Sequence, residues 1–83
     1  MKNEFSFQFG DNRDFLLLRK YVYRVEVIKP DAIFRIFYKS AGERFNDLGR
    51  HTITDMRTNY SNKFRQAFFD AYNDFIAENI LLG

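Results

Sequence analysis

The sequence has no cysteine, a single proline and no long run of apolar residues. Without cysteine it can build neither a disulfide framework nor a thiolate metal site, so we expect a reducing, cytoplasmic location. With one proline and no glycine-rich stretch it offers no linker, and 83 residues suffice for only one hydrophobic core. We therefore expect a single domain over residues 1–83, held together by side-chain packing.

A membrane segment and a secretion signal are also missing from the pattern. The longest apolar runs, residues 15–18 and 80–82, are far shorter than the roughly 20 residues that a membrane-spanning helix requires. Near the start the chain carries Lys2 and Glu4, where a signal peptide would need an apolar segment. We expect no membrane partner.

Charge is nearly balanced, while aromatic residues are abundant. Thirteen basic and eleven acidic side chains leave a net charge of +2. That balance does not identify a nucleic-acid or membrane binder and excludes an acidic mimic of DNA. Hydrophobic residues make up 46% of the chain and aromatic residues 19%, which supplies a core. The frequent Phe, Tyr, Ile, Asn and Lys have codons rich in A and T, which indicates an AT-rich gene such as those of many phages.

Three segments have the composition of β-strands, because they alternate apolar and polar residues or are rich in Val, Ile, Phe and Tyr. These segments are residues 5–9, 15–29 and 32–39. We expect residues 10–14 to form the first turn. Pro30 and Asp31 predict the second turn, since proline presets the backbone at a turn's second position and aspartate suits the third.

The predicted turn at Pro30 and Asp31 fixes a register that side-chain chemistry supports. On one face apolar residues oppose each other: Val27 with Phe34, Val25 with Ile36 and Tyr23 with Tyr38. On the other face we predict an ion pair between Glu26 and Arg35 and a cation–π contact between Arg24 and Phe37. The first hairpin would pair Phe9 with Phe15, Phe7 with Leu17 and Phe5 with Arg19, with a bulge near Leu18.

A capping box predicts a short helix after the third strand. Ser40 and Glu43 have the spacing of such a box, and Gly49 stands where a left-handed helix end would fall. We predict a helix over residues 41–48, with an irregular turn as the alternative because Gly42 is a poor helix former.

A second capping box, Thr52 with Asp55, predicts a long helix to the C-terminal end, with a break near residues 59–61. The predicted fold class is α+β. A three-stranded antiparallel β-meander packs against the long C-terminal helix, with a short helix between, in the order βββαα.

The C-terminal helix has more apolar surface than one sheet needs, because it presents two neighbouring apolar stripes. The first stripe is Phe64, Phe68, Ala71 and Phe75, and the second is Phe69, Tyr72, Ile76 and Ile80. Large exposed apolar patches on small proteins mark interaction sites, so we predict that the second stripe is a protein interface. Its predicted rim is acidic and consists of Asp70, Asp74 and Glu78. The alternative is that the second stripe packs inside the molecule.

The charges of this helix oppose its macrodipole. Arg57, Lys63 and Arg65 lie in its first half, while the three acidic residues lie in its second half. An antiparallel two-fold pair of helices would bring the two sets together, so a homodimer through this helix is one expected assembly. A solvated polar face is the alternative.

A metal or catalytic site has little support in the sequence. Acidic residues and the only histidine recur every four residues, at Glu43, Asp47, His51 and Asp55, a spacing that would align ligands for Zn²⁺ or Mn²⁺ on a continuous helix. Gly49 interrupts the predicted helix there and removes the alignment. No phosphate-binding loop, Ser-His-Asp order or catalytic carboxylate pair is recognisable. We expect no metal, no cofactor and no enzymatic activity.

Two functions follow as expectations. The first is a non-enzymatic protein-interaction module, for which the AT-rich composition suggests a phage accessory protein. It would inhibit a host protein, such as a defence or CRISPR component, by occluding its surface, and the sequence leaves that partner unidentified. The alternative is a single-stranded nucleic-acid-binding domain, because cations surround an aromatic ring on the outer face of the second hairpin. Its residues would be Lys20, Arg24, Arg35, Phe37 and Lys39.

Overall fold

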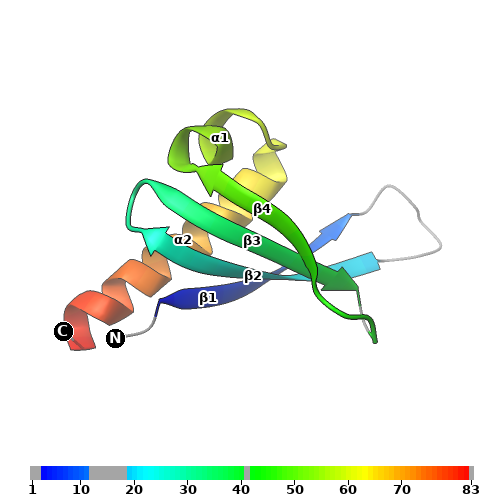
Figure 1. The fold of residues 1–83 in the computed structure, drawn as a ribbon, viewed down its shortest axis with the longest axis horizontal. Coiled ribbons are helices and arrows are strands. Elements are labelled where there is room, and N and C mark those ends of the chain that lie inside the picture. Colours follow the sequence, from blue (N-terminus) through cyan, green and yellow to red (C-terminus); the bar gives the residue numbers. More distant parts are fainter. Residues whose placement is uncertain (1–2, 12–18, 41, 83) are drawn as a thin grey trace.

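A computed structural model describes residues 3–11, 19–40 and 42–82, without the side chains of residues 11, 19, 20 and 80–82. This part of the chain forms one four-stranded antiparallel sheet and two helices, an α+β fold. The strands are β1 (Glu4–Asp11), β2 (Arg19–Lys29), β3 (Ile33–Ser40) and β4 (Asn46–Thr52), in the order β1-β2-β3-β4. The helices are α1 (Ile53–Thr58) and α2 (Asn62–Leu82). The strands cross in front of α2 in Figure 1, so the molecule has two layers.

The first strand forms as predicted but pairs differently. Its alternate phenylalanines are partly buried against the core. They face Val25, Tyr23 and Tyr21, in the pairs Phe5 with Val25, Phe7 with Tyr23 and Phe9 with Tyr21. The predicted pairing with residues 15, 17 and 19 is wrong, because Gly10 and Asp11 continue the strand instead of turning. The observed register sets each phenylalanine opposite a Val or Tyr, whereas the predicted one set Phe5 opposite Arg19. Residues 12–18, including the predicted bulge near Leu18, lie outside the described residues.

The second hairpin confirms the predicted register. The pairs are Val27 with Phe34, Val25 with Ile36 and Tyr23 with Tyr38. Asp31 has a φ of 59°, in the left-handed region that aspartate tolerates in turns. The Ala32 N–H donates to the Lys29 carbonyl at 3.1 Å, which closes the turn.

The residues predicted as a short helix over 41–48 instead form a turn and part of a fourth strand, so that prediction is wrong. Ser40 ends β3, and its carbonyl accepts a hydrogen bond from the Glu43 N–H at 3.1 Å. Gly49 has a φ of 82° and lies where the β3–β4 register shifts by one residue. Its left-handed backbone therefore accommodates a β-bulge rather than a helix end. Ala41 lies outside the described residues.

The predicted capping box at Thr52 is confirmed. The Asp55 N–H donates to Thr52 Oγ1, and the Thr52 N–H donates to Asp55 Oδ2, both at 3.1 Å. The predicted break at residues 59–61 is also present, and it divides the predicted long helix into α1 and α2. No helix in the described chain is both long enough and apolar enough to cross a membrane.

Arg65 secures the joint between the two helices. Its guanidinium donates to the Arg57 carbonyl and to Asn62 Oδ1. These bonds satisfy a carbonyl at the end of α1 and hold the start of α2 beside it. Arg65 therefore has a structural role within one molecule.

The core lies between α2 and one face of the sheet. Its buried residues are Val25, Phe34, Ile36, Met56, Phe64, Phe68, Tyr72 and Phe75. Phe68 lies at the centre, with its ring centroid 5.5 Å from that of Phe34 and 5.7 Å from that of Phe5. These tilted and edge-on contacts are the favourable arrangements for aromatic rings.

Tyr72 links α2 to the hairpin turn. Its hydroxyl donates to Asp31 Oδ1 at 2.6 Å and accepts from the Asp31 N–H at 2.8 Å. The side chain is 4% exposed, and burial, followed by the hydrogen bond to Asp31, raises the pKa of its hydroxyl. The left-handed Asp31 is thus held by a residue 41 positions away.

Replacing Tyr72 by phenylalanine tests this link. Tyr72→Phe keeps the ring but removes both hydrogen bonds to Asp31, so we expect the free energy of unfolding in urea to fall by about 1–2 kcal/mol. Tyr60→Phe is the matched control, because the Tyr60 ring stacks on Phe64 at 4.7 Å while the described chain gives its hydroxyl no hydrogen bond. The control should change stability by less than about 0.5 kcal/mol. Equal losses in the two variants would contradict the link.

Candidate nucleic-acid interface

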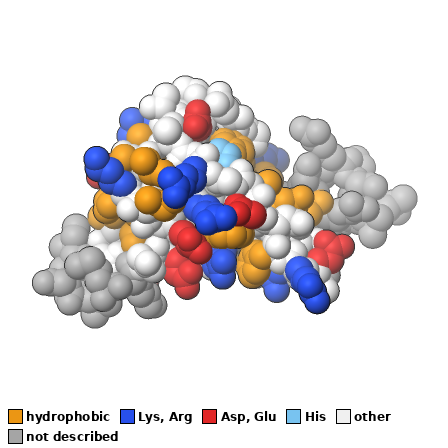
Figure 2. Space-filling view, in the orientation of Figure 1, with side chains coloured by type: hydrophobic (Ala, Val, Ile, Leu, Met, Phe, Trp, Pro, Cys, Tyr) orange, Lys and Arg blue, Asp and Glu red, His pale blue; other side chains and the backbone are white. Residues whose placement is uncertain are grey.

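Helix α2 covers one face of the sheet and leaves the other face open. Alternate residues of each strand point to the open face because side chains alternate along a strand. Figure 2 views the molecule from this side and shows basic, acidic and hydrophobic side chains intermixed over the strands. The open-face residues used below are Arg24, Glu26, Arg35, Phe37, Lys39, Asp47 and Arg50.

Two cations and two rings alternate across the middle of this face, and a third cation, Arg35, lies 5.4 Å from the ring centroid of Phe37. The Arg24 guanidinium carbon lies 4.5 Å from the ring centroid of Phe37 and 5.1 Å from that of Phe45. Lys39 Nζ lies 5.0 Å from the same Phe45 ring. We call Phe37, Arg24, Phe45 and Lys39 the cation–aromatic stack. The predicted contact between Arg24 and Phe37 is confirmed.

The rings of the stack remain accessible. Phe45 is 39% exposed, and Phe37 is partly buried by its cationic neighbours. Fully burying a phenylalanine would stabilise the fold by about 1.5–3 kcal/mol, and Phe45 forgoes part of that gain. The stack therefore leaves part of an aromatic side chain accessible to solvent, with positive charge beside it.

Arg24 forms only a long ion pair with an acidic side chain. Its Nη2 lies 3.6 Å from Glu26 Oε1, which is an ion pair too long for a hydrogen bond. Its Nε–H is shielded from solvent and finds no acceptor among the described residues. The terminal nitrogens of Arg24 thus keep hydrogen-bonding capacity for an incoming anion.

Arg35, in contrast, is engaged by Asp47. Its Nε donates to Asp47 Oδ2 at 3.1 Å, and its Nη2 donates to the same oxygen. The predicted ion pair between Arg35 and Glu26 is therefore wrong, because Glu26 pairs along its own strand with Arg24 and the fourth strand brings Asp47 to Arg35. Arg35 mainly fixes β4 to β3.

Asp47 also stabilises the bulge. Its Oδ1 accepts the Gly49 N–H at 2.7 Å. The hydrogen bond from Arg35, and then the one from Gly49, lower the pKa of the Asp47 carboxyl below its usual value, and Asp47 raises the pKa of Arg35. Arg50 lies directly opposite Arg35, a like-charge pair that is destabilising in a sheet.

The structure brings most of the predicted nucleic-acid residues together. Arg24, Arg35, Phe37 and Lys39 share the open face, whereas the side chain of Lys20 lies outside the described residues. Sequence reasoning misses Phe45 because it assigns residues 41–48 to a helix, and it misses Arg50 because it predicts no strand after that helix. Recognising residues 46–52 as a strand would have found Phe45, since continuing the pairing of Tyr38 with Asn46 sets Phe45 opposite Lys39.

The second apolar stripe of α2 is largely internal. Tyr72 is buried, so its predicted place in an exposed interface is wrong, because its ring packs in the core and its hydroxyl bonds to Asp31 in the hairpin turn. Phe69 and Ile76 are partly buried and pack against the core. The side chain of Ile80 lies outside the described residues. The three predicted rim residues, Asp70, Asp74 and Glu78, are exposed on α2.

The four residues considered as metal ligands do not share one helix face. Glu43 lies in the turn before β4, Asp47 and His51 lie in β4, and Asp55 lies in α1. Asp47 and Asp55 are already bonded to Arg35 and to the Thr52 cap. Within the described ranges, no three His, Asp or Glu side chains are placed to hold a metal ion.

The contact between Arg35 and Asp47 predicts a pH response. Because the Asp47 pKa is lower in the folded than in the unfolded chain, this carboxylate stabilises the fold above pH 3.8, and the stabilisation is lost as the pH falls through the folded pKa. In Arg35→Gln, carboxyl NMR titration should show the Asp47 pKa rising toward 3.8. Arg50→Gln is the control and should leave it nearly unchanged. A wild-type Asp47 that titrates at its ordinary value would contradict the assignment.

The open face can therefore stack on flat apolar groups and attract anions at the same time. Its rings come from β3 and the residue before β4, and its cations come from β2, β3 and β4. Comparison of the chain with models of known protein families, with curated proteins and with solved structures finds no match.

Proposed function

We propose that this protein binds single-stranded nucleic acid on the open face of its sheet and catalyses no reaction there. The observation that carries the proposal is the cation–aromatic stack. Unpaired bases stack on exposed aromatic rings, and the phosphates beside them are held by Lys and Arg. Phe45, 39% exposed between Arg24 and Lys39, has the surroundings that such a base requires.

The distribution of charge supports the same function. Arg50 opposite Arg35 costs stability in the free protein, and a phosphate between the two would remove the repulsion. Duplexes keep their base faces stacked inside, so exposed rings favour single strands over double strands. The net charge of +2 implies an affinity that depends on the stack as well as on phosphate contacts.

A second candidate is the protein-interaction module, of which inhibition of a host protein by occlusion is one form. The sequence favours this candidate by predicting an exposed second apolar stripe on α2, and the burial of Tyr72 weakens that argument. The observation that favours this candidate is a groove between β1 and α2 whose charged lining residues are all acidic.

Fluorescence anisotropy with a labelled oligothymidine of about 15 nucleotides tests the nucleic-acid proposal. Phe45→Ala should weaken binding by about 5- to 150-fold, because base stacking on one ring contributes about 1–3 kcal/mol. Lys39→Ala should reduce the slope of log affinity against log salt by about 0.7, as expected for one lost phosphate contact.

Ile28→Ala is the matched control, since Ile28 is an exposed apolar residue, 44% accessible, near the hairpin turn and outside the stack. It should bind like the wild type. Absence of binding at about 50 mM salt, tighter binding of the duplex, or an unaffected Phe45→Ala variant would overturn the proposal.

A further inference from the structure

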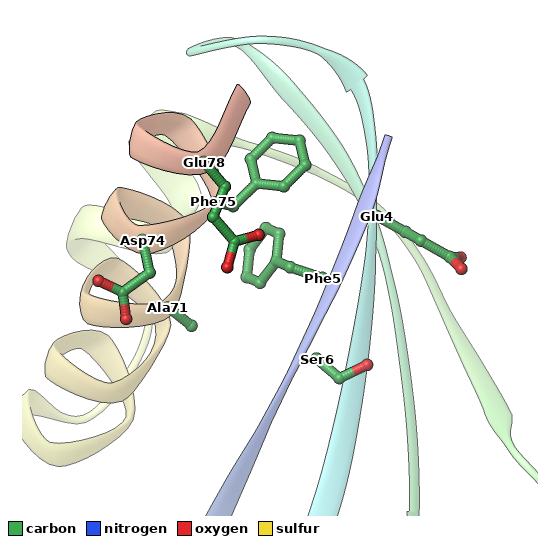
Figure 3. A pocket seen from close by; sticks show the side chains of 7 residues that line it. All are labelled: Glu4, Phe5, Ser6, Ala71, Asp74, Phe75 and Glu78. Atoms are coloured by element: carbon green, nitrogen blue, oxygen red, sulfur yellow. The ribbon is translucent and has the colours of Figure 1, made fainter. Parts of the chain in front are cut away.

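The outer edge of β1 lies in a groove beside α2. The groove has a volume of about 310 Å³ and is lined by Glu4, Phe5 and Ser6 of β1 and by Asp74, Phe75 and Glu78 of α2. Figure 3 shows the strand and the helix on either side of it. In the described chain, β1 pairs with β2 on one side only, and no strand occupies its other edge.

The lining residues show that the groove includes the strand's backbone edge. Phe5 points toward α2, whereas its neighbours Glu4 and Ser6 point toward the open face, because side chains alternate along a strand. All three line the same groove. They can do so only if the groove runs along the edge of β1 between the two faces.

The hydrogen-bond pattern identifies which backbone groups face the groove. The Val27 N–H donates to the Asn3 carbonyl at 2.8 Å, so Asn3 bonds toward β2. In an antiparallel pair, alternate residues bond to the neighbouring strand and those between them point away. The N–H and C=O groups of Glu4 and Ser6 therefore point into the groove, where another strand could pair with them.

The groove combines an apolar floor with negative charge. The ring centroids of Phe5 and Phe75 lie 5.4 Å apart, and the Glu78 carboxylate is turned toward Phe5, whereas Glu4 extends from β1 away from α2 and Asp74 extends from α2 away from β1 (Figure 3). Glu4 also lies directly opposite Glu26, a like-charge pair that is destabilising in a sheet. A cationic side chain near this edge would relieve that repulsion.

We propose that the edge of β1 accepts an extended segment of a partner protein that carries Lys or Arg at alternate positions. The segment would add a fifth strand by bonding to Glu4 and Ser6, with alternate side chains over the Phe5 and Phe75 floor. The proposal is independent of nucleic-acid binding. It rests on the second candidate function, to which it gives a site and a partner chemistry.

The probe is a blocked heptapeptide of alternating valine and lysine, titrated into the ¹⁵N-labelled protein. The Glu4 and Ser6 amides should shift and gain protection from hydrogen exchange, because they become bonded. The matching valine–glutamate peptide should bind at least about tenfold more weakly. A valine–lysine peptide N-methylated along one edge should also bind more weakly, since it lacks the donors for strand addition.

Two variants with matched controls separate the backbone and charge contributions. Ser6→Pro removes a donor that points away from β2, so it should leave the β1–β2 ladder intact and weaken the peptide by more than about tenfold, while Ser6→Val should bind it. Glu78→Lys should weaken the peptide about fivefold. Asp70→Lys makes the same charge change on α2 outside the groove and should have little effect.

Several outcomes would overturn the proposal. These are shifts confined to the β3–β4 face, equal binding of the valine–glutamate peptide, and equal effects of Glu78→Lys and Asp70→Lys. Shifts of Glu4 and Ser6 that grow with protein concentration without peptide would assign the edge to a second copy of the chain instead. If no alternating peptide binds while oligothymidine does, the interaction-module candidate fails along with this site. If the peptide binds Ser6→Pro as tightly as the wild type, the proposed site at the β1 edge is rejected, while the interaction-module candidate stands.

Discussion

A single helix can cover only one face of a four-stranded sheet, and the rest of the molecule follows from that constraint. The aromatic residues of α2 meet those of β1, β2 and β3 around Phe68, and this packing fixes which alternate residues are buried. Every other residue of the same strands must then face solvent. The exposed rings and cations of the open face are thus a consequence of how the core is closed.

Two like-charge pairs stand out among the intermixed charges of the strands. Arg35 and Arg50 oppose each other on β3 and β4, whereas Glu4 and Glu26 oppose each other on β1 and β2. Each like-charge pair weakens the sheet slightly. In the described chain, Asp47 forms an ion pair with Arg35 but not with Arg50, and Arg24 forms one with Glu26 but not with Glu4. The two proposals would place an anionic polymer beside the first pair and a basic segment beside the second, where each ligand would relieve a repulsion.

The sequence predicts best where the information is local. Pro30 and Asp31 fix a short turn and with it the β2–β3 register, and Thr52 with Asp55 marks a helix start whatever lies around it. Prediction from the sequence fails where contacts between distant segments determine the local structure. β4 is polar on both faces and shows no alternation, and Gly49 has a left-handed backbone that suits a bulge as well as a helix end. On the helix alone, Tyr72 belongs to the second stripe, and its internal position becomes clear only from its contacts with the sheet and the hairpin turn.

Solvent paramagnetic relaxation of the aromatic ring protons, measured with a soluble gadolinium chelate, tests most directly whether α2 seals one face and leaves the other open. Strong relaxation is expected at Phe45 on the open face. Weak relaxation is expected at Phe68 and Tyr72, which lie on the side of α2 that packs against the sheet. Strong relaxation at Tyr72 together with protection of Phe45 would contradict this arrangement, because the exposed and covered faces would then be exchanged.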